Sequence, residues 1–463
     1  MTSSPERFSA FAEKMRSENL PEIVISTFEK YYRHLVQGQT GLISEADILP
    51  VDSLPDTRQF DESMIGAGEA ALSKTIVLKL NGGLGTSMGL EQAKSLLEVK
   101  DGLSFLDITA RQVISSGIPM VLMNSFSTQA DSLAALRKYP ELQGDIPLDF
   151  LQHKVPKVVQ ADFSPASWPA DPELEWCPPG HGDIYTALVT SGMLDSMLAN
   201  GYEYVFVSNA DNLGAVIDTA ILGYFARNSL PFMMEVADRT EADRKGGHLA
   251  KLRNGQLILR ESAQCPAEDM DAFQDVNRHK YFNTNNLWIN LPALEQRLSR
   301  DDNVLELSMI RNSKTVDPTD SNSTPVFQLE TAMGAAIAVF ENAGAVRVPR
   351  SRFAPVKTTS DLLSIRSDDY VLNENFVVVP VADRRAGPAI VSLDPNWYKF
   401  IGDLESRFPH GAPSLLDCEK FTVSGDIRFG KDITLRGYVE MVNKTAQQVR
   451  VEDGAVISGY WEA

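Results

Sequence analysis

The chain has 463 residues and a formal net charge of −19, and a chain of this length divides into two or three domains. Apolar residues make up 43% of it and charged residues 23%, which is typical of a soluble globular protein. The acidic balance argues against nucleic acid or a membrane surface as a partner, because both usually require a basic face.

Cysteine content and hydropathy narrow the class of protein further. Cys177, Cys265 and Cys418 lie far apart without a CxxC pair, which excludes a disulfide framework and argues against a zinc cluster. The first residues lack the apolar stretch of a secretory signal, and no apolar run reaches the ~18 residues that cross a membrane. We therefore expect a cytoplasmic protein with no membrane partner.

Residues 1–65 are expected to form a helical N-terminal region. Apolar residues recur three and four positions apart in "ERFSAFAEKMRSE" and "PEIVISTFEKYYRHLV", which predicts two helices. The stretch "SEADILPVDSLPD" at residues 44–56 is rich in prolines and small polar residues and is interpreted as a connector.

Residues 66–385 show short apolar runs that alternate with helical patterns. The predicted strands are "KTIVLKL", "PMVLMNS", "YVFVSNA", "PFMMEVA" and "NLWIN", and the predicted helices are "FLDITARQVISS", "YTALVTSGMLDSMLAN" and "LETAMGAAIAVFENA". Buried apolar strands separated by helices indicate βαβ units and a mostly parallel sheet. Ligands of such sheets bind beyond the carboxyl ends of the strands.

Residues 386–463 are expected to form a separate all-β module. Two apolar ladders run at a spacing of six, namely Phe421, Ile427, Ile433, Val439 and Val423, Phe429, Leu435, Met441. A six-residue period indicates a parallel β-helix. An ordinary meander remains open as the alternative, because a period of six contains a period of two.

A glycine-rich stretch, "KLNGGLGTSMG" at residues 79–89, follows the first predicted strand. Its position suits a phosphate-binding loop. The Walker A motif fails because Ala93 precedes Lys94 and Ser95, and the dinucleotide fingerprint fails because GxGxxG is one residue too long here. A purely structural glycine turn stays open at this point.

The loop and the segments after it resemble one family. GGxGTxxG followed by "AKS" resembles the nucleotide loop of the sugar-nucleotide pyrophosphorylases, and the full "LNGGLGTSMG" resembles the UTP–glucose-1-phosphate uridylyltransferases. Further matching segments follow in the family's order, among them "PPGHGDIY", "FVSNADNLGA", "FNTNNLW", "QLETAMGAAI" and "VPRSRFAPVKTTSDLL". The resemblance implies a Rossmann-like nucleotidyltransferase domain with a mixed, mostly parallel sheet, a helical N-terminal part and a C-terminal left-handed β-helix.

The resemblance also implies a reaction. Glucose 1-phosphate attacks the α-phosphorus of UTP and gives UDP-glucose and pyrophosphate, assisted by Mg²⁺. A phosphate oxygen is already anionic at neutral pH, so catalysis reduces to alignment and charge neutralisation without a general base. Two alternatives stay open: a uridylyltransferase for another sugar 1-phosphate, such as galactose 1-phosphate or N-acetylglucosamine 1-phosphate, and a non-catalytic nucleotide-sugar-binding protein.

Site residues carry over position by position from the matching motifs. Lys94 and Lys357 would contact the phosphates as catalytic residues, and Asp211 at a strand end would hold Mg²⁺ and the nucleotide, with a structural Asx-turn as the alternative. The nucleoside would lie on the backbone of Leu80, Asn81, Gly82 and Gly83, near Gly180, with the Gln152 amide on uracil. The sugar phosphate and sugar would contact His181, Asn209, Gly247, Asn283, Asn285 and Glu330.

Three further expectations concern charged residues and assembly. Glu91 stands where many family members have a lysine, so its carboxylate is expected to face solvent or the metal. Arg350 and Arg352 are expected in surface or interface salt bridges. The C-terminal module is expected to mediate a homo-oligomer.

Overall fold

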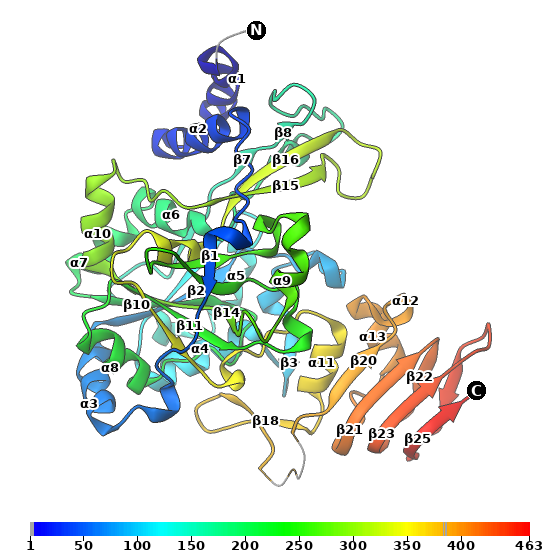
Figure 1. The fold of residues 1–463 in the computed structure, drawn as a ribbon. Helices are drawn as coiled ribbons and strands as arrows, with labels where there is room; N and C mark the ends of the chain where they lie inside the picture. The colour runs from blue at the N-terminus through cyan, green and yellow to red at the C-terminus, as the bar shows by residue number, and fades with distance from the viewer. Residues whose placement is uncertain (1–3, 383, 385–386) are drawn as a thin grey trace.

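The computed structural model describes residues 4–382, 384 and 387–463. Its N-terminal part contains the two predicted helices, α1 (Ser4–Ser17) and α2 (Glu22–Val36) (Figure 1). Phe11 packs on Tyr32 with ring centroids 4.8 Å apart, and both side chains are fully buried. The apolar face that the spacing predicted is therefore the face that joins the two helices.

The predicted connector at residues 44–56 contains a strand, so the prediction of a plain connector was wrong there. β1 (Ile48–Pro50) pairs antiparallel with β12 (His248–Leu252) at the edge of the central sheet. Ile48 is buried against Ala250 and Ile258, and this burial outweighs the proline-rich composition. The N-terminal part is thereby tied to the sheet.

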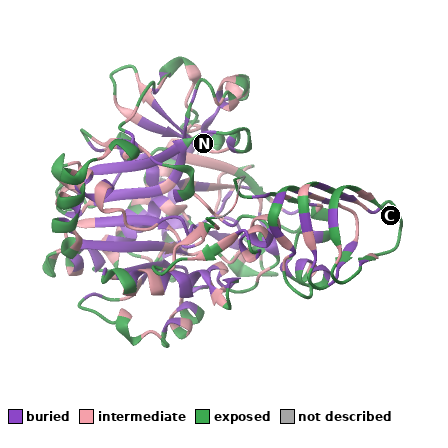
Figure 2. Ribbon diagram, turned by 90° about the horizontal axis from the view of Figure 1, so that it is seen from below, coloured by how far each residue is buried: buried purple, intermediate pink, exposed green. Residues whose placement is uncertain are grey.

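The core is a ten-stranded mixed sheet in the order β1-β12-β14-β10-β2-β5-β6, with β11, β13 and β17 attached. Figure 2 shows that its central strands are buried along most of their length. The other strands of this sheet are β2 (Thr75–Asn81), β5 (Met120–Asn124), β6 (Asp149–Leu151), β10 (Tyr204–Asn209), β11 (Phe232–Asp238), β13 (Leu257–Arg260), β14 (Tyr281–Asn290) and β17 (Gly344–Arg347). All five predicted strands are present, and β10, β2, β5 and β6 run parallel as expected, whereas β14 is antiparallel to β10 and β11.

Helices cover both faces of the sheet. Alternate residues of β2 face opposite sides: Ile76 and Leu78 pack with α6 (Ile184–Thr190), α7 (Met193–Ala199) and α10 (Leu291–Arg300), while Val77 packs with α4 (Phe105–Ser116). The other helices of this part are α3 (Glu62–Ala71), α5 (Gln129–Leu136), α8 (Thr219–Arg227), α9 (Met270–Gln274) and α11 (Thr359–Arg366). The layering is that of an α/β fold, as predicted.

Two helix predictions need correction. Residues 185–200 form two helices because Gly192 adopts φ 72°, a left-handed conformation that interrupts the helix. Residues 329–343 were predicted as one helix, but they begin in β16 (Pro325–Thr331) and continue as a 3₁₀ segment at Met333–Ala338. Pairing of β16 with β15 (Met309–Thr315) overrides the helical propensity of the alanine-rich run.

The small strands outside the main sheet form short ribbons around it. β16 also pairs with β8 (Val158–Val159), and three two-stranded ribbons join β3 (Glu98–Lys100) to β4 (Leu103–Ser104), β7 (Val155–Pro156) to β9 (Trp176–Cys177), and β18 (Tyr370–Leu372) to β19 (Val378–Pro380). No helix of the described residues is both long enough and apolar enough to cross a bilayer.

The C-terminal part stands beside the α/β part as stacked strands (Figure 1). It comprises α12 (Pro395–Tyr398), α13 (Ile401–Arg407), β20 (Ile390–Leu393), β21 (Ser414–Ser424), β22 (Ile427–Phe429), β23 (Thr434–Val442), β24 (Val449–Val451) and β25 (Val456–Glu462). The strand pairs of these elements are all parallel, which contradicts the meander, and all eight ladder residues are buried. The predicted boundary between residues 385 and 386 lies outside the described residues.

Candidate active site

A cavity of about 320 Å³ lies where the parallel strands β2 and β10 end. Its lining comprises Leu80, Asn81, Gly82, Gly83, Lys94, Ser95, Met123, Gln152, Pro178, Gly180, His181, Asn209, Ala210 and Asp211. Ten of these fourteen residues are predicted site residues. The position at the carboxyl ends of the strands is the one expected for a ligand in such a sheet.

The glycine loop forms one wall of the cavity. Gly85 and Gly89 adopt φ 64° and 75°, so the chain turns tightly twice and brings Lys94 back until its N–H donates to the Gly83 carbonyl at 3.1 Å. A Cβ on Gly82 would lie 2.7 Å from Oε1 of Gln152. Only glycine therefore allows the Gln152 amide to pack directly on the loop backbone at this position.

Two asparagines near the cavity have structural side-chain roles. The Asn81 amide donates to Asn124 at 2.7 Å and to Ser132 at 2.8 Å, so its side-chain nitrogen is already engaged within the protein. The Asn212 side chain donates to the Arg352 carbonyl and accepts from the Ala354 N–H, and it thereby fixes the turn that follows β10. The neighbouring Asp211 is held at the cavity wall by this turn.

Lys94 and Asp211 form an ion pair inside the cavity. Nζ of Lys94 lies 2.6 Å from Oδ2 of Asp211, and about a fifth of each side chain is exposed. The pair joins residues 117 positions apart, one on the glycine loop and one after β10. A cation and a carboxylate thus face the same space, where phosphate oxygens and a divalent metal could each find a partner.

His181 lies opposite this pair as a neutral imidazole. The Met333 N–H donates to its Nδ1 at 2.9 Å, so Nδ1 is the acceptor and Nε2 carries the proton. Burial lowers the pKa of His181 to about 4. Its predicted role as a hydrogen-bond donor rather than a base is compatible with this arrangement.

The predicted sugar residues Gly247, Asn283 and Asn285 form a second group that does not line the cavity. The Asn283 N–H donates to the Gly247 carbonyl at 3.0 Å, and its amide donates to Oδ1 of Asn285 at 2.8 Å. Asn285 adopts φ 58° at a register shift between β14 and β11, a conformation that asparagine tolerates better than most residues. This bulge brings the two amides side by side.

The remaining predicted residues lie around these two groups. Glu330 is on β16 beside Gly180, whose φ of 82° lets the loop pass close to that strand. Lys357 is exposed and does not line the cavity, but its segment reaches the Asp211 turn, where Pro355 bridges to Asn212. Glu91 is exposed and outside the cavity lining.

Two residues near the site had no signal in the sequence. Glu261 lies over Gly247, where an added Cβ would meet its Oε2 at 2.5 Å, and burial raises the pKa of this carboxyl. Lys79 is buried beneath the loop and donates to Ser208 Oγ at 2.7 Å and to the Ala215 carbonyl at 2.9 Å. Burial, followed by the charge of Arg352, lowers the pKa of Lys79 to about 7.

The fold and the cavity define an α/β nucleotidyltransferase, with a glycine loop and a lysine–carboxylate pair meeting at the strand ends. The family model of UTP–glucose-1-phosphate uridylyltransferase matches residues 25–436, and the chain belongs to that family. The UTP–glucose-1-phosphate uridylyltransferase of Solanum tuberosum is 42% identical over 84% of this chain and 80% of its own length.

Solved structures agree with this assignment. A variant of the UDP-glucose pyrophosphorylase of Leishmania major in complex with UDP-glucose matches with a TM-score of 0.91 and 44% identity, over 99% of each chain. The UDP-glucose phosphorylase of Trypanosoma brucei matches with a TM-score of 0.89 and 46% identity, over 99% of this chain and 100% of its own. The fold prediction of an α/β nucleotidyltransferase and the family resemblance are confirmed.

Proposed function

We propose that this protein transfers a uridylyl group from UTP to glucose 1-phosphate. A phosphate oxygen of glucose 1-phosphate attacks the α-phosphorus of UTP, the bond to the bridging α–β oxygen breaks, and pyrophosphate leaves with the electron pair. The observation that carries this proposal is the Lys94–Asp211 pair, which faces the cavity beside the glycine loop. The attacking oxygen is already anionic, so the residues need only align the two phosphates and neutralise charge.

The cavity has separate places for the two ends of the nucleotide. Uracil would lie in the cavity against the Gly82 backbone and the Gln152 amide, which offers both a donor and an acceptor. Lys94 lies at the other end of the loop, and it would exchange Asp211 for the triphosphate when substrate enters. Lys357 would close on the phosphates from the segment that Pro355 ties to the Asp211 turn.

The residues present fit a magnesium ion that arrives with the nucleotide. Among the described residues no three His, Cys, Asp or Glu side chains are placed to hold a metal together, while Asp211 offers one carboxylate to the cavity. Mg²⁺ commonly takes one or two carboxylates and completes its shell with phosphate oxygens and water. When bound, it would supply positive charge at the α-phosphate.

The sugar would occupy the space between the cavity residues and the second group, which is Gly247, Asn283 and Asn285. His181 Nε2–H would donate to the sugar phosphate, and Asn209 would contact the substrate from the end of β10. Hydroxyl groups need paired donors and acceptors, which the amides of Asn283 and Asn285 and the Glu261 carboxylate supply around Gly247. Glu330 would contact the sugar from its position beside Gly180.

A substrate panel tests this proposal. Pyrophosphate release is measured with UTP and each of glucose, galactose and N-acetylglucosamine 1-phosphate, with ATP replacing UTP as the control for the base. We expect glucose 1-phosphate with UTP to give the highest kcat/KM. A higher value for another sugar would move the proposal to that substrate, and no release with any sugar would favour a non-catalytic binding protein.

The protonation of His181 gives a pH prediction. In the unfolded chain this histidine has the ordinary pKa of about 6.5 and is protonated below that pH. In the folded protein the pKa of His181 is about 4. The free energy of unfolding should therefore fall as pH drops from about 6.5 towards 4, and less so in His181→Gln. Tm measured for both proteins across this range checks the prediction, and parallel Tm curves would contradict a lowered pKa of His181 in the folded state.

The C-terminal part, residues 386–463, is proposed to be a left-handed β-helix beside a helical region 1–65 and a catalytic domain 66–385. We propose that it also joins copies of the chain, because Tyr438 and Tyr460 are more than half exposed on its stacked strands. Light scattering should give the molar mass of a homo-oligomer for the full chain and a lower mass for the variant carrying Tyr438→Lys and Tyr460→Lys. Equal masses would refute this surface as the interface.

We also propose a cytoplasmic location. The three cysteines are free and buried in the described structure, and unpaired thiols persist in a reducing compartment.

A further inference from the structure

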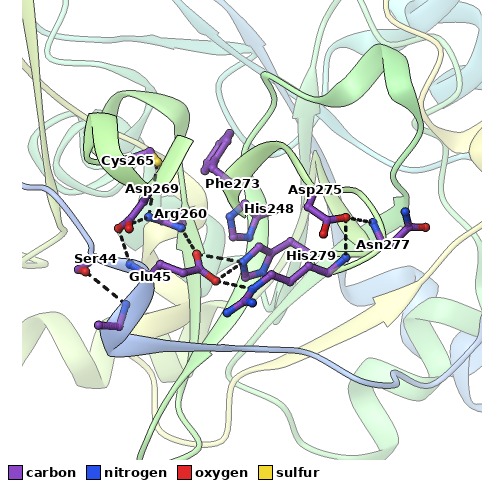
Figure 3. Close-up of polar contacts among 12 residues, drawn as sticks. Ser44, Glu45, His248, Arg260, Cys265, Asp269, Phe273, Asp275, Asn277 and His279 are labelled. Carbon is purple, nitrogen blue, oxygen red and sulfur yellow. Dashed lines mark hydrogen bonds and ion pairs between the residues drawn. The ribbon is translucent and has the colours of Figure 1, made fainter. Parts of the chain in front are cut away.

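A buried charged cluster joins the N-terminal part to the strands behind the proposed sugar site. Glu45, between the N-terminal helices and β1, accepts hydrogen bonds from Arg260 at 2.6 Å, Arg278 at 2.7 Å and His279 at 3.0 Å (Figure 3). Arg260 and His279 are fully buried. The Glu45 backbone N–H also donates to Asp269 at 2.7 Å.

The contacts of Glu45 reach three strands at once. Arg260 ends β13, and His279 leads into β14 and stacks on His248 at the start of β12, with ring centroids 3.9 Å apart. His248 and Arg260 are direct partners in the pairing of β12 with β13. One carboxylate therefore contacts the end of β13 and the segment before β14 directly, and it reaches β12 through the His248 ring.

The proposed sugar residues are the immediate neighbours of these contacts. Gly247 immediately precedes His248 and Glu261 immediately follows Arg260, and the Glu261 carboxylate lies against Gly247. Successive residues of an extended chain face opposite sides, so the side chain of Glu261 points away from that of Arg260. Asn283 adds its backbone N–H to the Gly247 carbonyl.

The pKa of Glu45 favours an ionised carboxylate, which strengthens its hydrogen bonds to the residues around it. Burial acts to raise the pKa of Glu45, but contacts with His279, Arg260 and Arg278 outweigh it and leave the pKa below its ordinary value. Burial lowers the pKa of His279 although Glu45 acts to raise it, and Nε2 of His279 donates to the Glu45 carboxylate at 3.0 Å. Charge-assisted bonds of this kind fix geometry more strongly than neutral ones.

We infer that Glu45 is a positioning residue for the sugar side of the site, acting through Arg260 and His279 on the strand ends at which Gly247, Glu261 and Asn283 lie. This inference rests on the proposed sugar role of those three residues. Loss of the carboxylate would leave Arg260 with Asp269 as its remaining ion-pair partner among the described residues and would let the ends of β12 and β13 shift. A shift of these strand ends should weaken contacts to the sugar and leave the glycine loop in place.

The test is steady-state kinetics of Glu45→Gln, which keeps the size of the side chain but loses the charge. We expect KM for glucose 1-phosphate to rise about tenfold while KM for UTP changes less than about twofold. Asp426→Asn is the matched control: it breaks a similarly buried carboxylate–arginine pair, with Arg407, in the C-terminal part. It should lower Tm without changing the ratio of the two KM values.

A second variant decides the matter if Glu45→Gln fails to fold. Arg278→Gln removes one of the three side chains on Glu45 from a half-exposed position and should raise KM for glucose 1-phosphate about threefold. A rise of both KM values in parallel, or of neither, in the folded variant overturns the inference. Asn283→Ala distinguishes the positioning role of Glu45 from the proposed sugar role of Asn283. An unchanged KM for glucose 1-phosphate in this variant would refute the sugar role itself.

Discussion

Lys357→Ala is expected to lower kcat by about 10²–10³, because the alanine enzyme has one cation fewer at the phosphates where charge develops in the transition state. The Lys357 side chain makes few contacts that could stabilise the fold. Its Nζ lies over the Phe353 ring at 5.6 Å, the side chain is exposed, and the backbone N–H rather than the ammonium contacts Asp361. The folded state should therefore tolerate its loss, with Tm within about 1 °C of the parent.

The matched control is Lys138→Ala, which removes another exposed lysine that lies over an aromatic ring, at 5.5 Å from Tyr139. Its kcat should equal that of the parent protein. Single-turnover measurements with saturating UTP and glucose 1-phosphate separate chemistry from product release. If Lys357→Ala turned over at the parent rate, Lys357 would have no catalytic role and Lys94 alone would serve the phosphates.

Local patterns predicted the cavity well because its parts lie in sequence where β-strands end. Glycines permit the tight turns of the loop, and polar residues directly after apolar strands meet at one edge of a sheet. Patterns therefore predicted where a site would lie, and the family resemblance implied the individual residues Leu80 to Gly83, Asn209 and Asp211, all of which line the cavity. Lys357 does not follow this pattern. It lies on a long segment near the cavity, and its side chain does not line the cavity.

Long-range partners could not be predicted in the same way. Arg260 and Glu45 are 215 positions apart, and no spacing connects them. Arg352 was expected at a surface or interface, yet it is buried and pairs with Glu235 at 2.7 Å. Both arginines look like ordinary surface residues in sequence, because arginine is seldom buried and only the tertiary partner reveals the exception.

The Asn285 bulge shows a different limit. The short apolar run predicted a strand at "NLWIN", but β14 begins five residues earlier and includes the shift that brings the Asn283 and Asn285 amides together. Polar residues in "YFNTN" hide that extension, because they interrupt the apolar run and a bulge departs from regular strand pairing.

Asp211→Asn is expected to lower kcat by about 10²–10³ and to raise the Mg²⁺ concentration needed for half-maximal rate. The substitution keeps the shape of the side chain but removes the charge that faces Lys94 across 2.6 Å. An amide is a weaker ligand for Mg²⁺ than a carboxylate, so metal and nucleotide would bind less well together. Turnover across a Mg²⁺ titration measures both effects.

A structural explanation of the same loss is tested with Glu175→Gln. Glu175 forms a partly buried ion pair with Lys14, at the contact between α1 and the segment before β9, and like Asp211 it is mostly shielded from solvent. That variant should lose stability while its Mg²⁺ dependence stays that of the parent. Asp211→Asn should instead keep its Tm, because its uncharged amide can still accept a hydrogen bond from Lys94. An Asp211→Asn enzyme with the parent's Mg²⁺ dependence would show that the strand-end carboxylate only caps the turn, and the metal would then have to be held by the phosphates alone.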